Sequence, residues 1–333
     1  MKTPSPLIDN YGRRVSYVRM SVTDRCDFRC MYCMAEDMTF LPRSEVLSLE
    51  EFTLIAKSLK RLGVEKIRIT GGEPLIRKNV LLLFQELGAL GFKDLSLTTN
   101  GARLDRFAAD LVQAGVHRVN ISLDTLNADR FHAITRTGKL NDVLRGISAA
   151  KDAGFERIKI NSVILQNHNI DEVIDLAEFA IDNGIDISYI EEMPLGTIDS
   201  HQRNEEFVSS AQILDRLSQK IPLNISTAQT GGPSRYWQVQ GKPSRIGFIS
   251  PHSNNFCSSC NRIRLTAEGR LLMCLGNEHS IDLRKVLRSA VEDQGEKSIE
   301  HAIRAAIHLK PKQHHFEDAD APQIVRFMNT TGG

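Results

Sequence analysis

Tyr17-Val18-Arg19-Met20-Ser21-Val22 is the first of six short runs rich in β-branched residues. Each run is followed by a segment with helical periodicity and then by glycine or asparagine, as expected for a strand, a helix and a turn. The runs cover residues 17–22, 66–70, 94–99, 117–123, 157–164 and 186–191. Strands that alternate with helices form right-handed βαβ units and therefore a parallel sheet. The sequence thus predicts an α/β fold with a partial (βα)6 barrel.

The pattern changes after about residue 221. Gly231-Gly232-Pro233 is followed by short strand-like pieces at 236–240, 245–249 and 263–266 and then by two helical segments. This change predicts two domains, a barrel over residues 1–222 and a smaller α+β module over residues 223–333. Within the barrel, Ser48-Leu49-Glu50-Glu51 is a capping box that marks the start of a helix. The polar tract 313–318, which contains His314 and His315, is predicted to be solvated surface.

Composition places the chain among ordinary globular proteins. It has 333 residues, of which 41% are hydrophobic and 25% are charged, and this excludes a disordered, collagenous or coiled-coil chain. The formal net charge of +1 argues against nucleic-acid or membrane partners, although a local basic pocket is compatible with it. The sequence contains no apolar run of the ~18 residues that a membrane helix needs. We therefore expect a cytoplasmic protein.

The predicted strands end in residues suited to binding or catalysis. In β/α barrels the functional residues lie at the C-terminal ends of the strands, where the βα loops meet. Polar residues, glycine or potential ligands follow all six strands, at Thr23–Cys26, Gly71–Pro74, Thr98–Asn100, Ser122–Asp124, 159–161 and 191–194. This distribution predicts one functional site at that end of the barrel.

The six cysteines form two tight triplets rather than a disulfide framework. Cys26, Cys30 and Cys33 follow the spacing C-x3-C-x2-C in the loop after the first strand. Tetrahedral zinc normally takes four protein ligands. Three thiolates with one ligand missing suit a 4Fe-4S cluster with one iron open to another molecule. We therefore expect an iron–sulfur cluster here rather than zinc.

This triplet, together with Gly71-Gly72-Glu73-Pro74 after the second strand, resembles the motifs of the radical S-adenosylmethionine (SAM) enzymes. The resemblance implies that the glycine loop, including Gly72, holds the methionyl end of SAM. It further implies that Tyr32 contacts the adenine, Ser122 the methionyl or ribose part, and Met193 the adenine again. From the sequence alone, Met193 could equally be a core residue.

The second triplet is Cys257-Ser258-Ser259-Cys260, followed after thirteen intervening residues by Cys274. On spacing alone, a zinc site completed by His252, His279 or Asn261 stays open. Arg262 and Arg264 lie two residues apart on a predicted strand, and hence on one face beside these cysteines.

The run 256–275 closely resembles the C-terminal motif of the GTP cyclase family that opens molybdenum cofactor biosynthesis. The resemblance extends from Arg19 to the terminal Gly332-Gly333. It implies a second 4Fe-4S cluster that binds the guanine of GTP, and a terminal Gly332-Gly333 tail that acts in the active site. It also implies a set of GTP contacts: Arg19, Arg68, Thr98, Lys159, Arg262 and Arg264.

The resemblance implies a lyase that cleaves SAM reductively and cyclises GTP. The partners it implies are GTP, a low-potential electron donor, the next pathway enzyme (cyclic pyranopterin monophosphate synthase) through the product, and a second copy in a homodimer. Two positions depart from the family pattern. Ser188 stands where the sixth strand usually has arginine, and Ala35 stands where proline usually follows the first triplet.

Two other functions compete with this one. A peptide-modifying radical SAM enzyme with an auxiliary cluster would carry more C-terminal cysteines. A zinc-stabilised nucleic-acid-binding protein is disfavoured by the balanced charge and by the βα repeat.

Overall fold

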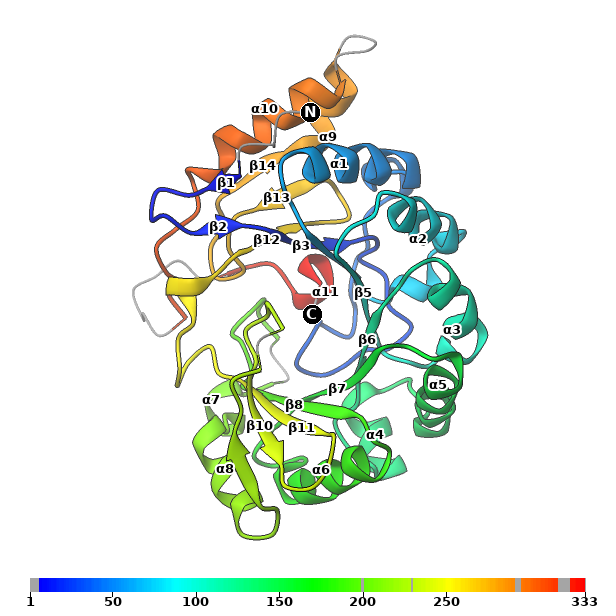
Figure 1. Ribbon diagram of the computed structural model, residues 1–333, viewed down its shortest axis with the longest axis vertical. Helices are drawn as coiled ribbons and strands as arrows, with labels where there is room; N and C mark the ends of the chain where they lie inside the picture. Colours follow the sequence, from blue (N-terminus) through cyan, green and yellow to red (C-terminus); the bar gives the residue numbers. More distant parts are fainter. Residues whose placement is uncertain (1–5, 199–200, 229, 291–294, 317–323, 333) are drawn as a thin grey trace.

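The computed structural model describes residues 6–198, 201–228, 230–290, 295–316 and 324–332. Its central element is one twelve-stranded sheet with the order β14-β13-β12-β3-β4-β5-β6-β7-β8-β11-β10-β9. Every neighbouring pair from β12 through β3–β8 to β11 is parallel. Figure 1 shows the sheet curving around a central space with helices on its outside. The predicted α/β class with a parallel sheet is confirmed.

The six predicted strands are present and pair in chain order. They are β3 (Tyr17–Ser21), β4 (Lys66–Thr70), β5 (Asp94–Thr99), β6 (Arg118–Ser122), β7 (Arg157–Val163) and β8 (Asp186–Ile190). The helices that connect them are α1 (Leu49–Arg61), α2 (Val80–Ala89), α3 (Leu104–Gln113), α4 (Ala128–Thr135), α5 (Leu140–Ala153) and α6 (Val173–Asp182). The predicted capping box opens α1, because the Ser48 hydroxyl accepts from the Glu51 N–H at 3.1 Å and Glu51 accepts from the Ser48 N–H at 2.7 Å.

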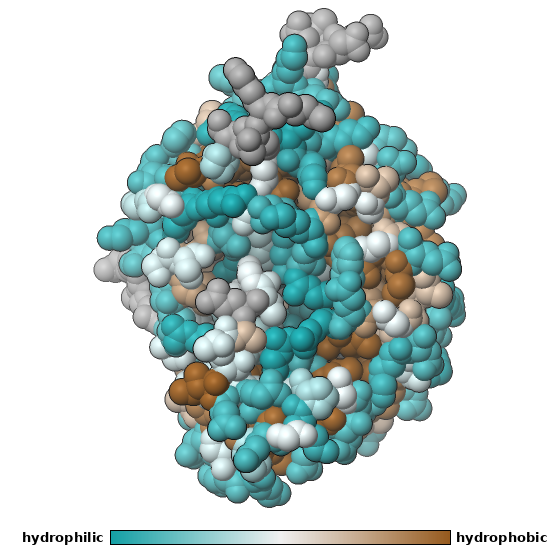
Figure 2. Space-filling model, in the orientation of Figure 1, coloured by the Kyte–Doolittle hydropathy of each residue, from teal (hydrophilic) through white to brown (hydrophobic). Residues whose placement is uncertain are grey.

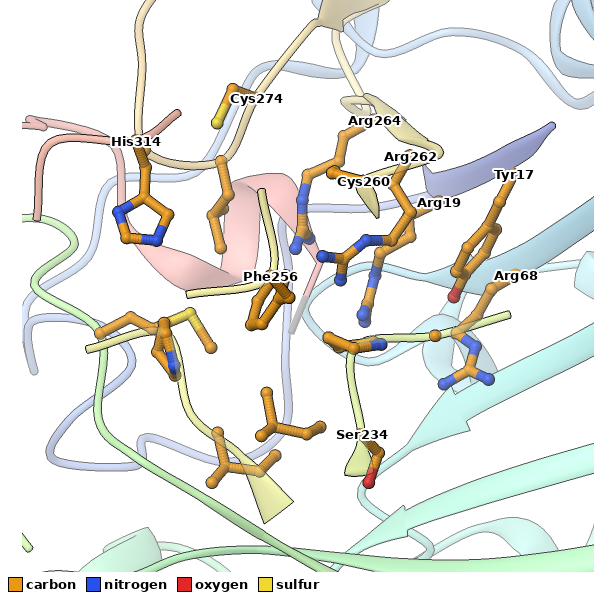
Figure 3. A pocket seen from close by; sticks show the side chains of 18 of the residues that line it. Tyr17, Arg19, Arg68, Ser234, Phe256, Cys260, Arg262, Arg264, Cys274 and His314 are labelled. Carbon is orange, nitrogen blue, oxygen red and sulfur yellow. The ribbon is translucent and has the colours of Figure 1, made fainter. Parts of the chain in front are cut away.

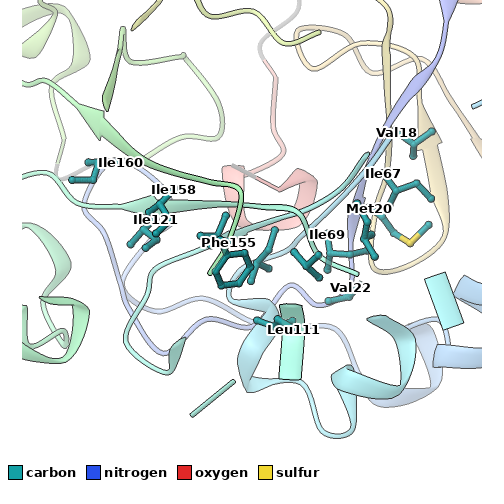
Figure 4. Packing of buried hydrophobic residues seen from close by; sticks show 14 of the residues in the cluster. Val18, Met20, Val22, Ile67, Ile69, Leu111, Ile121, Phe155, Ile158 and Ile160 are labelled. Carbon is teal, nitrogen blue, oxygen red and sulfur yellow. The ribbon is translucent and has the colours of Figure 1, made fainter. Parts of the chain in front are cut away.

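The two faces of the sheet differ in chemistry because side chains alternate along each strand. Val18, Ile67, Ile69, Ile121 and Ile160 point to the helices and are fully buried with the helix residues (Figure 4). Burial of each such side chain contributes about 1.5–3 kcal/mol relative to exposure. The alternate positions of the same strands carry polar and charged residues on the inner face. The hydrophobic core therefore lies between sheet and helices, and the central space is left for polar groups.

Residues after 222 extend the same sheet at both edges. The added strands are β9 (Leu223–Ile225), β10 (Arg235–Val239), β11 (Arg245–Ile249), β12 (Arg262–Leu265), β13 (Arg270–Leu272) and β14 (Ser280–Asp282). β11 pairs with β8, and β12 pairs with β3. The unpaired edges of the six-stranded sheet are thereby covered. The domain division at residue 222 stays a prediction, and the sheet itself is continuous across it.

The remaining elements lie around these strands. They are the short pair β1 (Leu7–Ile8) and β2 (Arg14–Val15), α7 (Arg203–Glu206), α8 (Ser210–Ser218), α9 (Leu283–Ser289), α10 (Gly295–Ile307) and α11 (Met328–Thr331). α11 lies in the central space of the sheet (Figure 1). On the face drawn in Figure 2, hydrophilic residues predominate. Among the described residues, no helix has the length and apolar composition needed to cross a membrane.

Candidate active site

Two cavities lie next to each other inside the curved sheet. The first is lined by Cys26, Cys30 and Cys33, and the second by Cys257, Cys260 and Cys274. Both cavities are also lined by the same four residues: Asn161, Ile190, Met193 and Met328. The two triplets, which are far apart in sequence, therefore face adjoining spaces.

The loop that carries the first triplet is fixed by backbone hydrogen bonds. The Cys33 N–H donates to the Cys30 carbonyl at 3.0 Å, and the Met31 N–H donates to the Ile134 carbonyl at the end of α4 at 3.0 Å. The Phe28 N–H donates to the Cys26 sulfur at 3.3 Å. Burial raises the pKa of the Cys30 thiol, and the neighbouring Cys33 and Cys26 raise it further. The three cysteines are therefore held in one partly buried loop that lines the first cavity.

Gly71 and Gly72 are required by close backbone packing. A Cβ on Gly72 would lie 2.3 Å from the Arg25 carbonyl oxygen, and one on Gly71 would lie 2.5 Å from the Thr23 carbonyl oxygen. The Gly72 N–H donates to the Thr23 carbonyl at 2.7 Å. The glycines thus bring the loop after β4 against the cysteine loop, and Gly72 also lines the first cavity. The role of Gly72 in holding SAM stays a prediction.

Glu73 stabilises the same region through buried hydrogen bonds. Its fully buried carboxylate accepts from the Thr99 hydroxyl at 2.8 Å, from the Asn100 N–H at 2.6 Å and from the Leu75 N–H at 2.9 Å. Burial raises the pKa of Glu73 to about 7, against the lowering effect of these hydrogen bonds. This residue therefore ties the ends of β4 and β5 together.

The residues expected to contact SAM lie around the first cavity. Tyr32, Gly72 and Ser122 line it, and Met193 lines both cavities. The Tyr32 hydroxyl donates to Asp124 Oδ2 at 2.6 Å, while Asp124 Oδ1 accepts from the Val163 N–H at 2.8 Å. Tyr32 is thus held between the triplet and the end of β6. Its contact with adenine stays a prediction.

Among the described residues that line the cavities, Thr98 and Asn161 are two that have a buried polar atom without a hydrogen-bond partner. Thr98 Oγ1 and Asn161 Oδ1 are both buried, and neither forms a hydrogen bond within the described part of the chain. Thr98 lines the first cavity, and Asn161 lines both. Buried polar atoms are normally paired, so these two mark a place for a polar ligand. Thr98, a predicted GTP contact, lies on the side of the first triplet, and its contact with GTP stays a prediction.

The second triplet surrounds the other cavity. Cys257 begins a 3-10 turn (Cys257–Ser259), Cys260 ends it, and Cys274 follows β13. Burial raises the pKa of the Cys260 thiol, but the nearby cations Arg262 and Lys310 lower it to about 7. A thiol with such a pKa readily provides the thiolate that a metal needs.

Two of the three side chains considered as a fourth zinc ligand are engaged elsewhere. The His252 ring pairs through Nε2 with the Glu192 carbonyl at 2.8 Å, and Asn261 donates to the Ser16 hydroxyl at 3.4 Å. The third, His279, lines a different, superficial pocket.

Within the described residues, no three His, Cys, Asp or Glu side chains are arranged to hold a single metal ion. In a 4Fe-4S cluster each cysteine binds a different iron, so its ligands do not converge on one point. Two sets of three cysteine sulfurs, each lining a cavity, fit such clusters in the chemistry of their donor atoms.

Five cations predicted to contact GTP line the second cavity, and they come from the adjacent strands β12, β3 and β4 and from β7 further along the sheet: Arg19, Arg68, Lys159, Arg262 and Arg264. The guanidinium groups of Arg19, Arg262 and Arg264 lie close together and point into the same space (Figure 3). Burial and the neighbouring cations lower the pKa of Arg19 to about 10. Cations crowded in a desolvated cavity repel one another, and a polyanion relieves that repulsion.

Two further residues of this cavity escaped the sequence analysis. Burial would raise the pKa of Tyr17, but the surrounding cations, Arg68 first, lower it to about 7. Burial lowers the pKa of Lys66 to about 7. The Lys66 ammonium contacts Asp94 Oδ2 at 2.9 Å and the Thr230 carbonyl at 3.1 Å, and it lies 4.7 Å from the centre of the Tyr17 ring. The sequence does contain a pattern that could have identified both residues. Tyr17 and Lys66 each lie two positions before a predicted GTP contact, Arg19 or Arg68, and therefore on the same face of their strand.

The C-terminal segment enters the central space. Arg264 donates to the Thr331 carbonyl at 3.2 Å and also to the Gly332 carbonyl, and Asn329 donates to the Asp24 carbonyl at 2.8 Å. Gly332 has φ +77°, and a Cβ there would lie 2.1 Å from a Thr70 side-chain carbon. The tail up to Gly332 is therefore docked beside one of the predicted GTP contacts. Gly333 lies outside the described residues.

The prediction of a solvated surface is wrong for His314. This side chain is buried, lines the second cavity and stacks on Phe316 with 4.3 Å between the ring centres. The local sequence is polar, and its burial arises from tertiary contacts with the second triplet that no local pattern reveals.

Comparison with known proteins agrees with this geometry. Residues 20–180 match the Radical SAM superfamily model, and residues 185–316 match the model described as Molybdenum Cofactor Synthesis C. The crystal structure of Streptococcus suis SuiB bound to S-adenosylmethionine has a similar fold, with a TM-score of 0.59 and 15% identity, covering 89% of this chain and 69% of that one. The fold and the first triplet define a protein of the radical SAM class.

Similar curated proteins identify the family within the radical SAM class. A GTP 3′,8-cyclase of Saccharophagus degradans is 58% identical over 331 residues, covering 99% of either chain. A GTP 3′,8-cyclase of Pseudomonas entomophila is 55% identical over 334 residues, covering 100% of this chain and 99% of the relative. The chain belongs to the GTP 3′,8-cyclase family. As a member of this family, the protein uses 4Fe-4S clusters and SAM as cofactors.

Proposed function

We propose that the chain is a radical SAM lyase that converts GTP to (8S)-3′,8-cyclo-7,8-dihydroguanosine 5′-triphosphate, the first step of molybdenum cofactor biosynthesis. The observation that carries the proposal is the cluster of buried cations beside the second cysteine triplet, in a cavity that adjoins the first triplet. A nucleoside triphosphate placed there would neutralise the cations while its ribose faced the neighbouring cavity.

The first cavity has the groups to bind and orient SAM. Cys26, Cys30 and Cys33 would hold a 4Fe-4S cluster, which would supply the electron for the reductive cleavage of SAM and so the radical chemistry at the 3′ position of GTP. Gly72, Ser122 and Tyr32 stand around this cavity, and Met193 lies at its border with the second. Their role is to hold the adenosyl group toward the substrate and to exclude water.

The second cavity has the groups to bind GTP. Cys257, Cys260 and Cys274 would hold a second cluster against the guanine. Arg262 and Arg264 come from β12, Arg19 and Arg68 from β3 and β4, and Lys159 from β7. Guanidinium groups suit phosphate because they donate two parallel hydrogen bonds to its oxygens. Asn161, which lines both cavities, and Thr98, which lines the first, have side-chain oxygens that are unpaired in the described chain, and they would be available to the ribose at the border between the cavities.

The Gly332-Gly333 tail completes the substrate site. Arg264 holds the carbonyls of Thr331 and Gly332, so the tail and the phosphates would share one arginine. Glycine at residue 332 is needed for the positive φ and for the close approach to Thr70.

The proposed reaction implies further partners and a cellular location. A low-potential electron donor must reduce the first cluster, and the next pathway enzyme, cyclic pyranopterin monophosphate synthase, would take the product. We place the enzyme in the cytoplasm, as a homodimer, with no nucleic-acid or membrane partner.

The test is anaerobic incubation of the reconstituted enzyme with GTP, SAM and dithionite. We expect 5′-deoxyadenosine and the cyclised nucleotide in comparable amounts, measured by liquid chromatography and mass spectrometry. A parallel reaction with ATP in place of GTP controls for the base. Colourless protein with stoichiometric zinc, or 5′-deoxyadenosine without a cyclised nucleotide, would contradict the proposal.

A further inference from the structure

A buried lysine lies behind the second cysteine triplet. Lys310 follows α10 and is only 3% exposed. Its ammonium donates to the Arg262 carbonyl at 2.8 Å, to the Met273 carbonyl at 2.8 Å and to the Cys260 sulfur at 3.6 Å. A lysine ammonium has three donors, so each has an acceptor. Lys310 is not among the residues that line the GTP cavity.

The three acceptors belong to the separate segments that carry the triplet. Cys260 is itself a triplet residue, the Arg262 carbonyl is two residues further on, and the Met273 carbonyl directly precedes Cys274. Between β12 and β13 the ladder pairs Arg264 with Leu272 and Leu265 with Leu271, and it extends no further toward the cysteines. Beyond that point Lys310 links the two segments, and so it fixes Cys260 relative to Cys274.

The position of Lys310 is itself fixed by the N-terminal segment. Arg13 donates to the carbonyls of Cys257 and Lys312, each at 2.8 Å, and to the Pro311 carbonyl at 2.5 Å. Asp9 accepts from Arg13 Nε at 2.6 Å. This arrangement attaches the chain directly after Lys310, at Pro311 and Lys312, to Cys257, the first cysteine of the triplet, and leaves Lys310 little freedom to move away.

Among the residues that the structure describes, no carboxylate compensates the charge of Lys310. Its acceptors are two carbonyls and one sulfur, and within the described residues no Asp or Glu forms an ion pair with it. A buried cation is costly unless an anion balances it. A 4Fe-4S cluster bound by three thiolates would be such an anion, and it would sit next to Cys260.

We propose that Lys310 is a positioning residue of the second cluster site. Its ammonium joins the segments that carry the cysteines and places one positive charge beside the cluster. That charge favours the one-electron-reduced cluster over the oxidised one, because the reduced form is one unit more negative. The proposal rests on the assignment of Cys257, Cys260 and Cys274 as cluster ligands.

The test uses the full-length chain in a background with Cys26, Cys30 and Cys33 changed to Ala, in which only the second triplet can hold a cluster. Lys310→Met removes the charge at similar length, and Lys310→Arg keeps it. Lys312→Met, at an exposed position two residues away, is the matched control. Iron and sulfide content, the midpoint potential from titration with dithionite followed by electron paramagnetic resonance, and circular dichroism are measured on all four proteins.

We expect Lys310→Met either to bind the cluster with a midpoint potential more negative than that of the background, or to lose iron that Lys310→Arg retains. Lys312→Met should match the background in both iron content and potential. A background protein without iron and sulfide would contradict the cluster assignment itself, separately from the role of Lys310.

Full iron content and an unchanged potential in Lys310→Met would overturn the proposal. Loss of iron in both Lys310→Met and Lys310→Arg would overturn it as well, because the site would then require the shape of lysine rather than its charge.

Discussion

Individual side chains on the inner face of the sheet determine what the second cavity can bind. The residues at alternate strand positions are Tyr17, Arg19, Lys66 and Arg68, with Arg262 and Arg264 on the next strand. The sequence shows that the two residues of each pair, such as Tyr17 and Arg19, are i, i+2 neighbours on one face of a strand. It does not show that the pairs converge on one space, because that depends on the curvature and stagger of the sheet.

The first prediction concerns Arg262, which stacks over Phe256 at 4.8 Å and points into the cavity. Arg262→Ala should weaken GTP binding by about tenfold to a hundredfold, since a charge-assisted hydrogen bond contributes roughly 1.5–3 kcal/mol. Calorimetry with GTP and with guanosine measures the effect, and Arg106→Ala, at an exposed position of α3, is the control. An equal loss for guanosine would show that Arg262 does not bind the triphosphate.

The second prediction is a pH dependence of GTP binding. Burial lowers the pKa of Lys66 to about 7, so its positive charge is lost as the pH rises through 7. Ionisation of Tyr17, whose pKa is also lowered to about 7, adds a negative charge over the same range. Both changes reduce the attraction for a polyanion, and GTP affinity should therefore fall between about pH 7 and 8.5.

Lys66→Met is the comparison for this pH profile. The γ-phosphate of GTP ionises identically with either protein, so the difference between the two profiles isolates Lys66. We expect weaker binding and a flatter profile in the variant. Profiles of equal slope would show that the charge state of Lys66 does not influence binding.

At the scale of elements, the loops after β3 and β4 carry the first triplet and the glycines, and tight packing of loop on loop sets their positions. The glycine loop after β4 and the cysteine loop after β3 are in backbone contact at Gly71 and Gly72. Because backbone cannot move aside as a flexible side chain can, these positions exclude a Cβ.

The third prediction follows from this contact. Gly72→Ala would place a Cβ 2.3 Å from the Arg25 carbonyl oxygen and should lower the free energy of unfolding by about 1–3 kcal/mol. Iron bound by the first triplet should fall as the cysteine loop shifts. Urea unfolding and iron content measure the two effects, with Gly295→Ala, where the nearest contact is 3.4 Å, as control. Unchanged stability and iron would mean that the loops separate freely.

The fourth prediction concerns α11 and the tail after it. Deleting Gly332 and Gly333 should leave iron content and basal SAM cleavage intact but block cyclisation of GTP, because Arg264 would lose its contact with the Gly332 carbonyl. A synthetic peptide with the sequence of the last residues should partly restore activity. If the truncated enzyme cyclises GTP at the full rate, the tail has no role in the reaction.

The sequence predicted the strands, the capping box at Ser48 and the grouping of the cysteines, because periodicity and spacing are local signals. It did not reveal that residues after 222 extend the sheet at both edges, since β11 pairs with β8 and β12 with β3 only after the chain has folded. The burial of His314 and Lys310 escaped prediction for the same reason. Both lie in a polar stretch whose environment comes from the distant second triplet.

At the scale of the whole molecule, the adjoining cavities separate two tasks that the reaction must join. The first triplet and the glycine loop lie around one cavity, and the second triplet with the cations lies around the other. The residues that line both, including Asn161 and Met193, form the border across which a radical would act. Generation of the radical should therefore depend on the first triplet alone, and its use on both.

The fifth prediction tests this separation. Ala at Cys26, Cys30 or Cys33 should abolish SAM cleavage, since a thiolate ligand of the electron-donating cluster is lost. Ala at Cys257, Cys260 or Cys274 should remove about half the iron and abolish the cyclised product, yet leave uncoupled formation of 5′-deoxyadenosine, because the first cavity is lined by none of these residues. The ratio of 5′-deoxyadenosine to cyclised nucleotide measures the coupling. Full cyclisation by a protein without the second cluster would show that the second triplet does not orient GTP, and the cations alone would then have to position the substrate.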